Sequence, residues 1–190
     1  MAKVKVNPII EKIRGKVGDL VFKRYGDEVV LSRVPDMEGR EATEAQQATR
    51  ERFRQAALYG KMVMADPEAK ALYDDAATAK GKPVFSLTIA DFFNAPSVDE
   101  VDISGYGGNA GDVIRIRAHD DFDVTEVSVA IMTSAGQAVE NGMAEEKPVN
   151  SGLWIYTATQ AVAPGSTVRV LVTAKDRPGG TGAAEKEKPL

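Results

Sequence analysis

The chain has 190 residues, with 24 Lys or Arg, 28 Asp or Glu, one His and no Cys, and a net charge of −4. An apolar fraction of 43% and a charged fraction of 27% are typical of globular proteins and exclude wholesale disorder and collagen-like repeats. The missing Cys excludes a disulfide framework, a zinc–thiolate site and a cysteine nucleophile, and the single His excludes a multi-histidine metal centre. The acidic balance argues against nucleic-acid binding.

Two targeting features are also missing from the sequence. No run of about 18 apolar residues occurs, so we expect no membrane-spanning helix. The opening stretch MAKVKVNPIIEKIRGK has scattered charges, and it lacks the apolar core and small-residue cleavage site of a secretory signal. We therefore expect no signal peptide, which leaves the location open between the cytoplasm and the exterior, reached by a non-classical route.

The composition changes near Pro96. Residues 1–95 have 16 basic and 14 acidic side chains, whereas residues 96–190 have 8 basic and 14 acidic ones and 11 of the 17 glycines. This change predicts two domains, 1–95 and 96–180, because composition shifts at turn-rich stretches are typical of domain boundaries. Residues 181–190 are predicted to be a mobile tail.

Short β-rich runs open the first half. Residues 3–6 alternate Lys and Val and predict an edge strand. Residues 19–25 and 28–34 flank the pair Gly26-Asp27, and Gly supplies the positive φ of a type II′ turn. The two runs therefore predict a β-hairpin.

A helical period begins at Thr43. The spacing of Thr43 and Gln46 fits a capping box, in which the two side chains satisfy first-turn backbone amides. We predict a helix from there through Met64. Its apolar stripe contains Ala45, Ala48 or Thr49, Phe53, Ala56, Ala57, Gly60, and Val63 or Met64.

Two further helices are predicted in the first half. Asp66 as N-cap and Pro67 at the first helical position begin the second helix, and Gly81 ends it. A third, short helix is predicted to start at Thr88, with Asp91 in its first turn. The third helix is expected to bury Phe92 or Phe93.

The second half has no helical period and reads as strands. Four runs alternate apolar and polar residues, and residues 101–103 and 137–139 add edge strands. Such short strands, separated by Gly, Asn, Asp and Pro, predict an antiparallel sandwich, so the fold class is α+β. The inward-facing residues are Ile114, Ile116 and Ala118; Val127, Val129 and Ile131; Trp154, Tyr156 and Ala158; and Val168, Val170, Val172 and Ala174.

The second half resembles bacterial immunoglobulin-like domains. Residues 118–127, AHDDFDVTEV, match the pattern A-x-D-D-x-x-V-x-x-V, and residues 173–179, TAKDRPG, match A-x-D-x-x-G; Gly136 and the WIYTA of residues 154–158 also fit. The resemblance implies an immunoglobulin-like sandwich. That fold serves adhesion, assembly and spacing alike, so the resemblance implies no single activity.

The first half looks like small uncharacterised bacterial and phage-associated proteins. The resemblance is carried by residues 15–22, GKVGDLVF, residues 43–48, TEAQQA, and residues 90–96, ADFFNAP. It brings no activity to this chain.

Four carboxylates form the candidate metal site. Asp120, Asp121 and Asp123 follow one predicted strand and Asp176 ends another, and oxygen ligands that converge at one end of a sandwich suit Ca²⁺. The alternative is that these side chains cap turns through backbone amides, as Asp commonly does. The twelve-residue EF-hand spacing is absent. Calcium is the one cofactor that we weigh.

Three other patterns favour ordinary structural roles. His119 has no nucleophile beside it in the sequence, so we interpret it as a loop histidine rather than a triad member. The Gly-rich residues 105–111 lack the Lys-Ser/Thr of a phosphate loop and precede a strand, which indicates a connecting loop. Arg50, Arg54 and Lys61 share a helix face that we interpret as solvated rather than nucleic-acid-binding.

The favoured function is a non-catalytic structural protein that self-assembles into a filament or tube. The N-terminal run contains the apolar residues Val4, Val6, Ile9 and Ile10, and an extended arm of this kind completes a neighbour's sheet by strand addition. A contact of this kind that does not close on itself builds a homo-polymer, and the opposite net charges of the two halves favour that polarity. The alternative is that the arm pairs within its own domain.

The alternative function is an immunoglobulin-like binding module for a carbohydrate or protein partner. Loop aromatic residues support it thinly, because only Tyr106 and Phe122 qualify, and Trp154 and Tyr156 alternate along a strand as core residues do. An enzyme that uses paired Asp residues requires a cleft, which two small domains do not predict. We expect no enzymatic activity.

Overall fold

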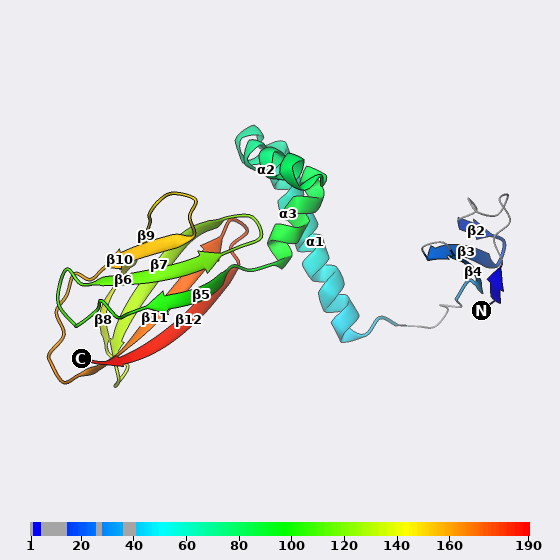
Figure 1. The fold of residues 1–190 in the computed structure, drawn as a ribbon. Coiled ribbons are helices and arrows are strands. Elements are labelled where there is room, and N and C mark those ends of the chain that lie inside the picture. The colour runs from blue at the N-terminus through cyan, green and yellow to red at the C-terminus, as the bar shows by residue number, and fades with distance from the viewer. Residues whose placement is uncertain (1, 5–14, 26–27, 36–40) are drawn as a thin grey trace. The chain divides into compact units, whose positions relative to one another are not determined.

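The computed structural model describes residues 2–4, 15–25, 28–35 and 41–190. Within these residues it contains three helices and twelve strands, and the strands form three four-stranded antiparallel sheets (Figure 1). The predicted α+β class is confirmed. The chain divides into two compact units, an N-terminal unit of residues 1–47 and a C-terminal unit of residues 48–190.

The N-terminal unit is an antiparallel sheet of strand order β1-β4-β3-β2. The predicted hairpin is confirmed, because β3 and β4 pair in register from Leu20 opposite Arg33 to Tyr25 opposite Glu28. The expected turn residues, Gly26 and Asp27, lie outside the described residues. The strands are β1 (Ala2–Val4), β2 (Gly15–Val17), β3 (Leu20–Tyr25) and β4 (Glu28–Arg33).

Strand β1 pairs with β4 of its own chain, with Lys3 opposite Val30 and Val4 opposite Val29. This is the alternative that we stated for the N-terminal arm. Of the predicted arm residues, Val4 belongs to β1, whereas Val6, Ile9 and Ile10 are outside the described part of the chain. Among the side chains described in this unit, only Val29 is buried.

Helix α1 (Glu44–Ala65) begins with the predicted capping box. The Thr43 backbone N–H donates to Gln46 Oε1 at 3.2 Å, and the Gln46 N–H donates to Thr43 Oγ1 at 3.3 Å. Further along, a Cβ on Gly60 would lie 2.7 Å from Thr88 Oγ1 and 2.8 Å from Phe85 Cε2. Gly60 therefore allows α1 to approach the third helix closely.

Helix α2 (Pro67–Lys80) has both predicted ends. The Asp66 carboxylate accepts the backbone N–H groups of Glu68 at 3.0 Å and Ala69 at 3.4 Å. Gly81 ends the helix with φ 60°, a left-handed backbone conformation that residues with a Cβ rarely adopt.

Helix α3 (Val84–Phe93) starts four residues earlier than we predicted. Pro83 precedes it with φ −60°, which suits a helix entry. Thr88 is not a cap, because its hydroxyl donates to the Phe85 carbonyl one turn earlier at 2.8 Å. Asp91 is buried rather than being a first-turn acid. Contrary to the prediction, Phe92 and Phe93 are only partly buried. None of the described helices has the length and apolarity to cross a membrane.

The C-terminal unit contains the predicted antiparallel β-sandwich, with sheets of order β5-β6-β10-β9 and β12-β11-β7-β8. One set of buried side chains joins the two sheets. The first sheet consists of β5 (Ser97–Asp102), β6 (Val113–His119), β10 (Leu153–Thr157) and β9 (Glu145–Glu146). The second consists of β12 (Thr181–Pro189), β11 (Thr167–Asp176), β7 (Val124–Thr133) and β8 (Ala138–Met143).

The predicted inward faces are confirmed. Strand β11 alternates buried and partly exposed residues from Val168 to Ala174, and β6 and β7 do the same. Trp154 is 7% exposed and Tyr156 is 4% exposed, so both belong to the core rather than to an open stacking surface.

The predicted mobile tail is wrong, because residues 181–189 form β12. This strand pairs with β11 along its whole length, from Thr181 opposite Lys175 to Pro189 opposite Thr167. The composition of the segment suggested a tail, but without β12 the long strand β11 would have an unpaired edge. Leu190 continues the contact, since its N–H donates to the Ser166 carbonyl at 2.9 Å.

Candidate functional site

The predicted metal residues lie where the sandwich loops meet the helices of the C-terminal unit. Phe122, between β6 and β7, stacks on Tyr73 of α2 with ring centroids 4.0 Å apart and planes 7° apart. It also packs against the helical core, which includes Val63 and Leu87. The helices therefore pack against these loops of the sandwich.

Each predicted calcium ligand has another partner. One Asp120 oxygen accepts the N–H groups of Phe122 at 3.0 Å and Asp123 at 3.2 Å. Asp123 pairs with Arg177 at 3.4 Å. Asp176 accepts the N–H groups of Gly179 and Gly180 at 2.8 and 2.5 Å. Asp121 accepts from the Asn94 amide, and its carbonyl accepts from Lys80 Nζ at 2.5 Å.

This arrangement matches the turn-capping alternative. Among residues 2–4, 15–25, 28–35 and 41–190, no three His, Asp or Glu side chains are grouped to hold a metal ion. The carboxylates instead satisfy backbone amides of their own loops and join the loops to the helices. Calcium binding stays a prediction.

A chain of hydrogen bonds links the three helices at this junction. The hydroxyls of Tyr59 on α1 and Tyr73 on α2 are 2.7 Å apart, and the Tyr73 hydroxyl donates to the Asp91 carboxylate on α3. Asp91 is 1% exposed. Burial raises the pKa of Asp91 to about 7, because a buried charge loses its hydration. The hydrogen bond from Tyr73 lowers this pKa, whereas the negative charges of Asp120 and Asp176 raise it further.

Asp91 and Asp120 are placed to share a proton. Asp91 Oδ1 and Asp120 Oδ1 are both buried and have no hydrogen-bond partner among the described residues, and interaction with the Asp120 side chain contributes to the raised pKa of Asp91. A protonated Asp91 donates to Asp120 and satisfies both oxygens. The sequence pattern does not predict this role, because it places Asp91 in the first turn of a helix. The available signal was a single acid inside the apolar run VFSLTIADFF.

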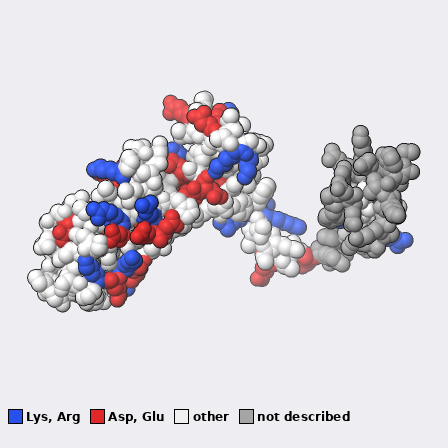
Figure 2. Space-filling view, in the orientation of Figure 1, with Lys and Arg blue, Asp and Glu red and all other residues white. Residues whose placement is uncertain are grey.

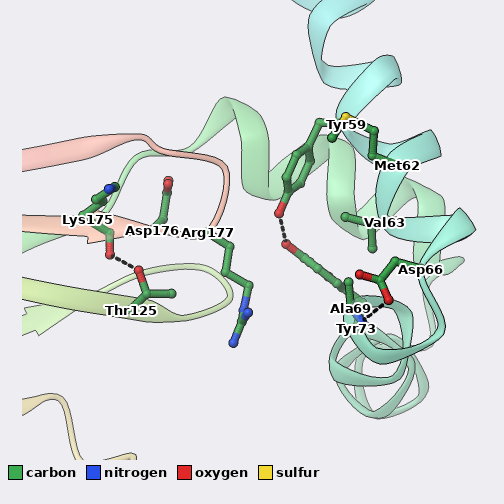
Figure 3. Close-up of a pocket in the computed structure, with 10 residues that line it drawn as sticks. All are labelled: Tyr59, Met62, Val63, Asp66, Ala69, Tyr73, Thr125, Lys175, Asp176 and Arg177. Carbon is green, nitrogen blue, oxygen red and sulfur yellow. Dashed lines mark hydrogen bonds between the residues drawn. The ribbon is translucent and has the colours of Figure 1, made fainter.

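A pocket of about 570 Å³ opens beside this network (Figure 3). The α1–α2 corner forms one wall, which includes Tyr59, Met62 and Val63. The opposite wall comes from the sandwich and includes Lys175 and Arg177. No pattern in the sequence indicates this pocket, because its two walls come from segments that are far apart along the chain.

His119 does not form a hydrolytic relay. Its side chain is 67% exposed, and Nδ1 lies 2.6 Å from Asp99 Oδ2. The Ser97 hydroxyl donates to the other Asp99 oxygen at 2.7 Å, so Ser97 and His119, which lie opposite each other in the β5–β6 register, both bond to Asp99. The hydrogen bonds from Ser97 and then His119 lower the pKa of Asp99.

Three basic residues of α1 that we predicted to share a face, Arg50, Arg54 and Lys61, are exposed. Arg54 pairs with Glu51 on the same helix. On the face shown in Figure 2, Lys and Arg side chains alternate with Asp and Glu over the C-terminal unit. This mixture matches the solvated interpretation of Arg50, Arg54 and Lys61.

No known protein-family profile matches the chain, and no curated protein matches it. Among solved structures, CopC from Methylosinus trichosporium OB3b is 17% identical, and the match covers 48% of this chain and 89% of that chain with a TM-score of 0.36. The Br derivative of BhCBM56 is 13% identical, with 50% and 92% covered and a TM-score of 0.33. A conjugative transposon lipoprotein from Bacteroides eggerthii DSM 20697 is 13% identical, with 50% and 94% covered and a TM-score of 0.26. Because these TM-scores are low, the assignment of a β-sandwich depends on the strand pairing of this chain and not on these matches.

Proposed function

We propose that this protein is a non-catalytic structural subunit that polymerises by exchanging its N-terminal strand. The observation that carries the proposal is the pairing of β1 with β4. A three-residue strand at the start of the chain occupies the edge of a small sheet, in register from Ala2 opposite Leu31 to Val4 opposite Val29. The β1 strand of a second copy offers the same backbone groups, so exchange replaces these hydrogen bonds one for one.

The exposure of the N-terminal unit supports this proposal. Val17 is 65% exposed, and Leu20 and Val34 are also exposed. A four-stranded sheet needs cover on one face for stability, and neighbouring copies supply such cover. A copy that donates β1 in one direction and accepts it from the other makes an open-ended contact, which gives a filament or tube. The sandwich, which we propose is immunoglobulin-like, then acts as a spacer.

Cysteine crosslinking tests strand exchange directly, because the natural chain has no Cys. We expect the Lys3→Cys/Val30→Cys variant to form a ladder of crosslinked oligomers on a non-reducing gel after mild oxidation, and filaments in negative-stain electron microscopy. These two residues face each other in the β1–β4 register. The Lys3→Cys/Arg33→Cys variant is the matched control, since its two positions are three residues out of register and on opposite faces.

Two results would overturn strand exchange. One is crosslinking only within single chains of the in-register variant. The other is assembly that persists unchanged after residues 1–10 are deleted, since the deletion removes the donated strand.

A second candidate is a binding module, and the pocket beside Tyr59 and Lys175 favours it. Its volume of about 570 Å³ falls within the range of small-ligand pockets, about 300–1,000 Å³. This candidate does not depend on assembly, because the pocket lies within the C-terminal unit.

A further inference from the structure

The pocket has one largely apolar wall and one cationic wall. The helical wall presents Met62, which is 71% exposed, together with Val63 and the ring of Tyr59. The sandwich wall presents the side chains of Lys175 and Arg177, and Figure 3 shows them on the opposite side from the helical residues. An occupant of this space meets apolar surface on one side and positive charge on the other.

Most acidic and hydroxyl groups of the lining have hydrogen-bond partners among the described residues, although the buried Asp176 Oδ2 has none. Asp66 caps α2 through two backbone N–H groups. Asp176 is 2% exposed and accepts two backbone N–H groups through Oδ1, and burial raises its pKa. The Thr125 hydroxyl donates to the Lys175 carbonyl at 3.1 Å, and the hydroxyls of Tyr59 and Tyr73 bond to each other.

The two cations keep free donors. Lys175 Nζ has no ion pair or hydrogen bond to any described residue, although its backbone carbonyl is bonded. The Arg177 guanidinium reaches Asp123 through one nitrogen at 3.4 Å. A guanidinium has five N–H donors in a planar fork, so most of them remain available. The groups that the pocket offers to a ligand are therefore positively charged donors.

We propose that this pocket binds a small organic anion with a flat apolar body, such as an aromatic carboxylate. The carboxylate accepts hydrogen bonds from Lys175 and Arg177, and the ring packs against Met62, Val63 and Tyr59. Charge-assisted bonds fix the orientation of the anion, and the adaptable Met62 side chain closes on the ring. This inference rests on the second candidate function, the binding module, and is independent of strand exchange.

Isothermal titration calorimetry with two probes tests the proposal on the full chain. The probes are 2-naphthoate and its neutral counterpart 2-naphthamide. We expect 2-naphthoate to bind with a dissociation constant below about 1 mM, the affinity reasonable for a ligand of this size, and 2-naphthamide to bind at least tenfold more weakly.

Three variants locate the binding site. Lys175→Met keeps the aliphatic stem and should weaken 2-naphthoate binding roughly tenfold, because it removes a charge-assisted donor. Met62→Glu places a negative charge at an exposed position of the apolar wall and should abolish 2-naphthoate binding without disturbing the fold. Lys186→Met, at an exposed residue of β12 outside the pocket, is the control and should leave binding unchanged.

Equal affinity for the two probes would overturn the proposal, as would no binding of 2-naphthoate. Equal weakening by Lys175→Met and Lys186→Met would also overturn it, since that result means a general charge effect. None of these outcomes bears on crosslinking between β1 and β4, so failure of this proposal and failure of assembly are distinguishable.

Discussion

The Asp91 carboxyl joins the helices to the sandwich, with Tyr73 on one side and Asp120 on the other. Its pKa rises on folding from 3.8 to about 7, so between these values the folded protein holds a proton that the unfolded chain releases. The stabilising contribution of Asp91 to the free energy of unfolding is therefore fully present below about pH 4. It decreases as the pH rises to about 7 and is absent above that pH. The loss is on the order of 4 kcal/mol, since one pKa unit corresponds to about 1.4 kcal/mol.

We expect Asp91→Asn to remove this pH dependence. The amide still accepts from Tyr73, and its N–H donates to Asp120 at every pH, so the variant should be more stable than the natural protein at pH 8 and similar at pH 4. The measurement is the free energy of unfolding in urea at half-unit steps from pH 4 to 8, taken as the difference between the two proteins.

Asp99→Asn is the control for this series. Asp99 is exposed and its pKa is lowered, so Asp99→Asn should not reduce the pH dependence of the free energy of unfolding as Asp91→Asn does. The shared-proton interpretation is wrong if the difference between Asp91→Asn and the natural protein stays constant across the pH range.

At the scale of the element, local sequence patterns predicted most helices and strands. The capping residues Thr43, Gln46 and Asp66 and the left-handed Gly81 act on backbone groups within one helical turn, so their effect is legible in the sequence. Thr88 misled the prediction, because a threonine hydroxyl also bonds backwards within a helix, and only the structure distinguishes that bond from a cap.

Strand β12 pairs with β11, its neighbour in sequence, and is also held by residues that are distant along the chain. Lys188 Nζ donates to the carbonyls of Ile103 at 2.8 Å, Ser104 at 3.2 Å and Tyr106 at 2.6 Å. These acceptors lie more than eighty residues away, in the segment that follows β5. The charged end of the chain is thereby anchored to the other sheet.

We expect Lys188→Met to lower the free energy of unfolding by about 1–3 kcal/mol, because three carbonyls lose a charged donor while the aliphatic stem remains. Lys186→Met, one strand period away with an exposed side chain, should change it by less than about 0.5 kcal/mol. Urea midpoints of both variants check this. Equal midpoints would mean that Lys188 does not anchor β12.

At the scale of the whole molecule, nearly all of the helical segment belongs to the same compact unit as the sandwich. The compact C-terminal unit runs from residue 48 to residue 190, and Phe122 of the sandwich belongs to the helical core. The domain boundary near Pro96, which we predicted from composition, stays a prediction, and fragments of the chain test it.

We expect a fragment of residues 42–190 to fold alone, with a melting temperature within about 5 °C of the full chain. It keeps the Thr43 cap and the whole helical core. A fragment of residues 96–190 is the comparison, and it should melt much lower or aggregate, because it exposes Phe122 and leaves Asp120 without Asp91. Thermal melts by circular dichroism measure both. Equal melting of the two fragments would favour the boundary at Pro96.

The sequence by itself determined the α+β class, the β3–β4 hairpin, the helix caps and the inward faces of the sandwich. Periodicity and capping depend on residues a few positions apart, so they are written in the local pattern. Only the tertiary structure decided the approach of Asp91 to Asp120, the pocket, and the contact of Lys188 on β12 with residues 103–106. Those features join segments that are distant along the chain, and which segments meet depends on how the helices and sheets pack rather than on any local signal.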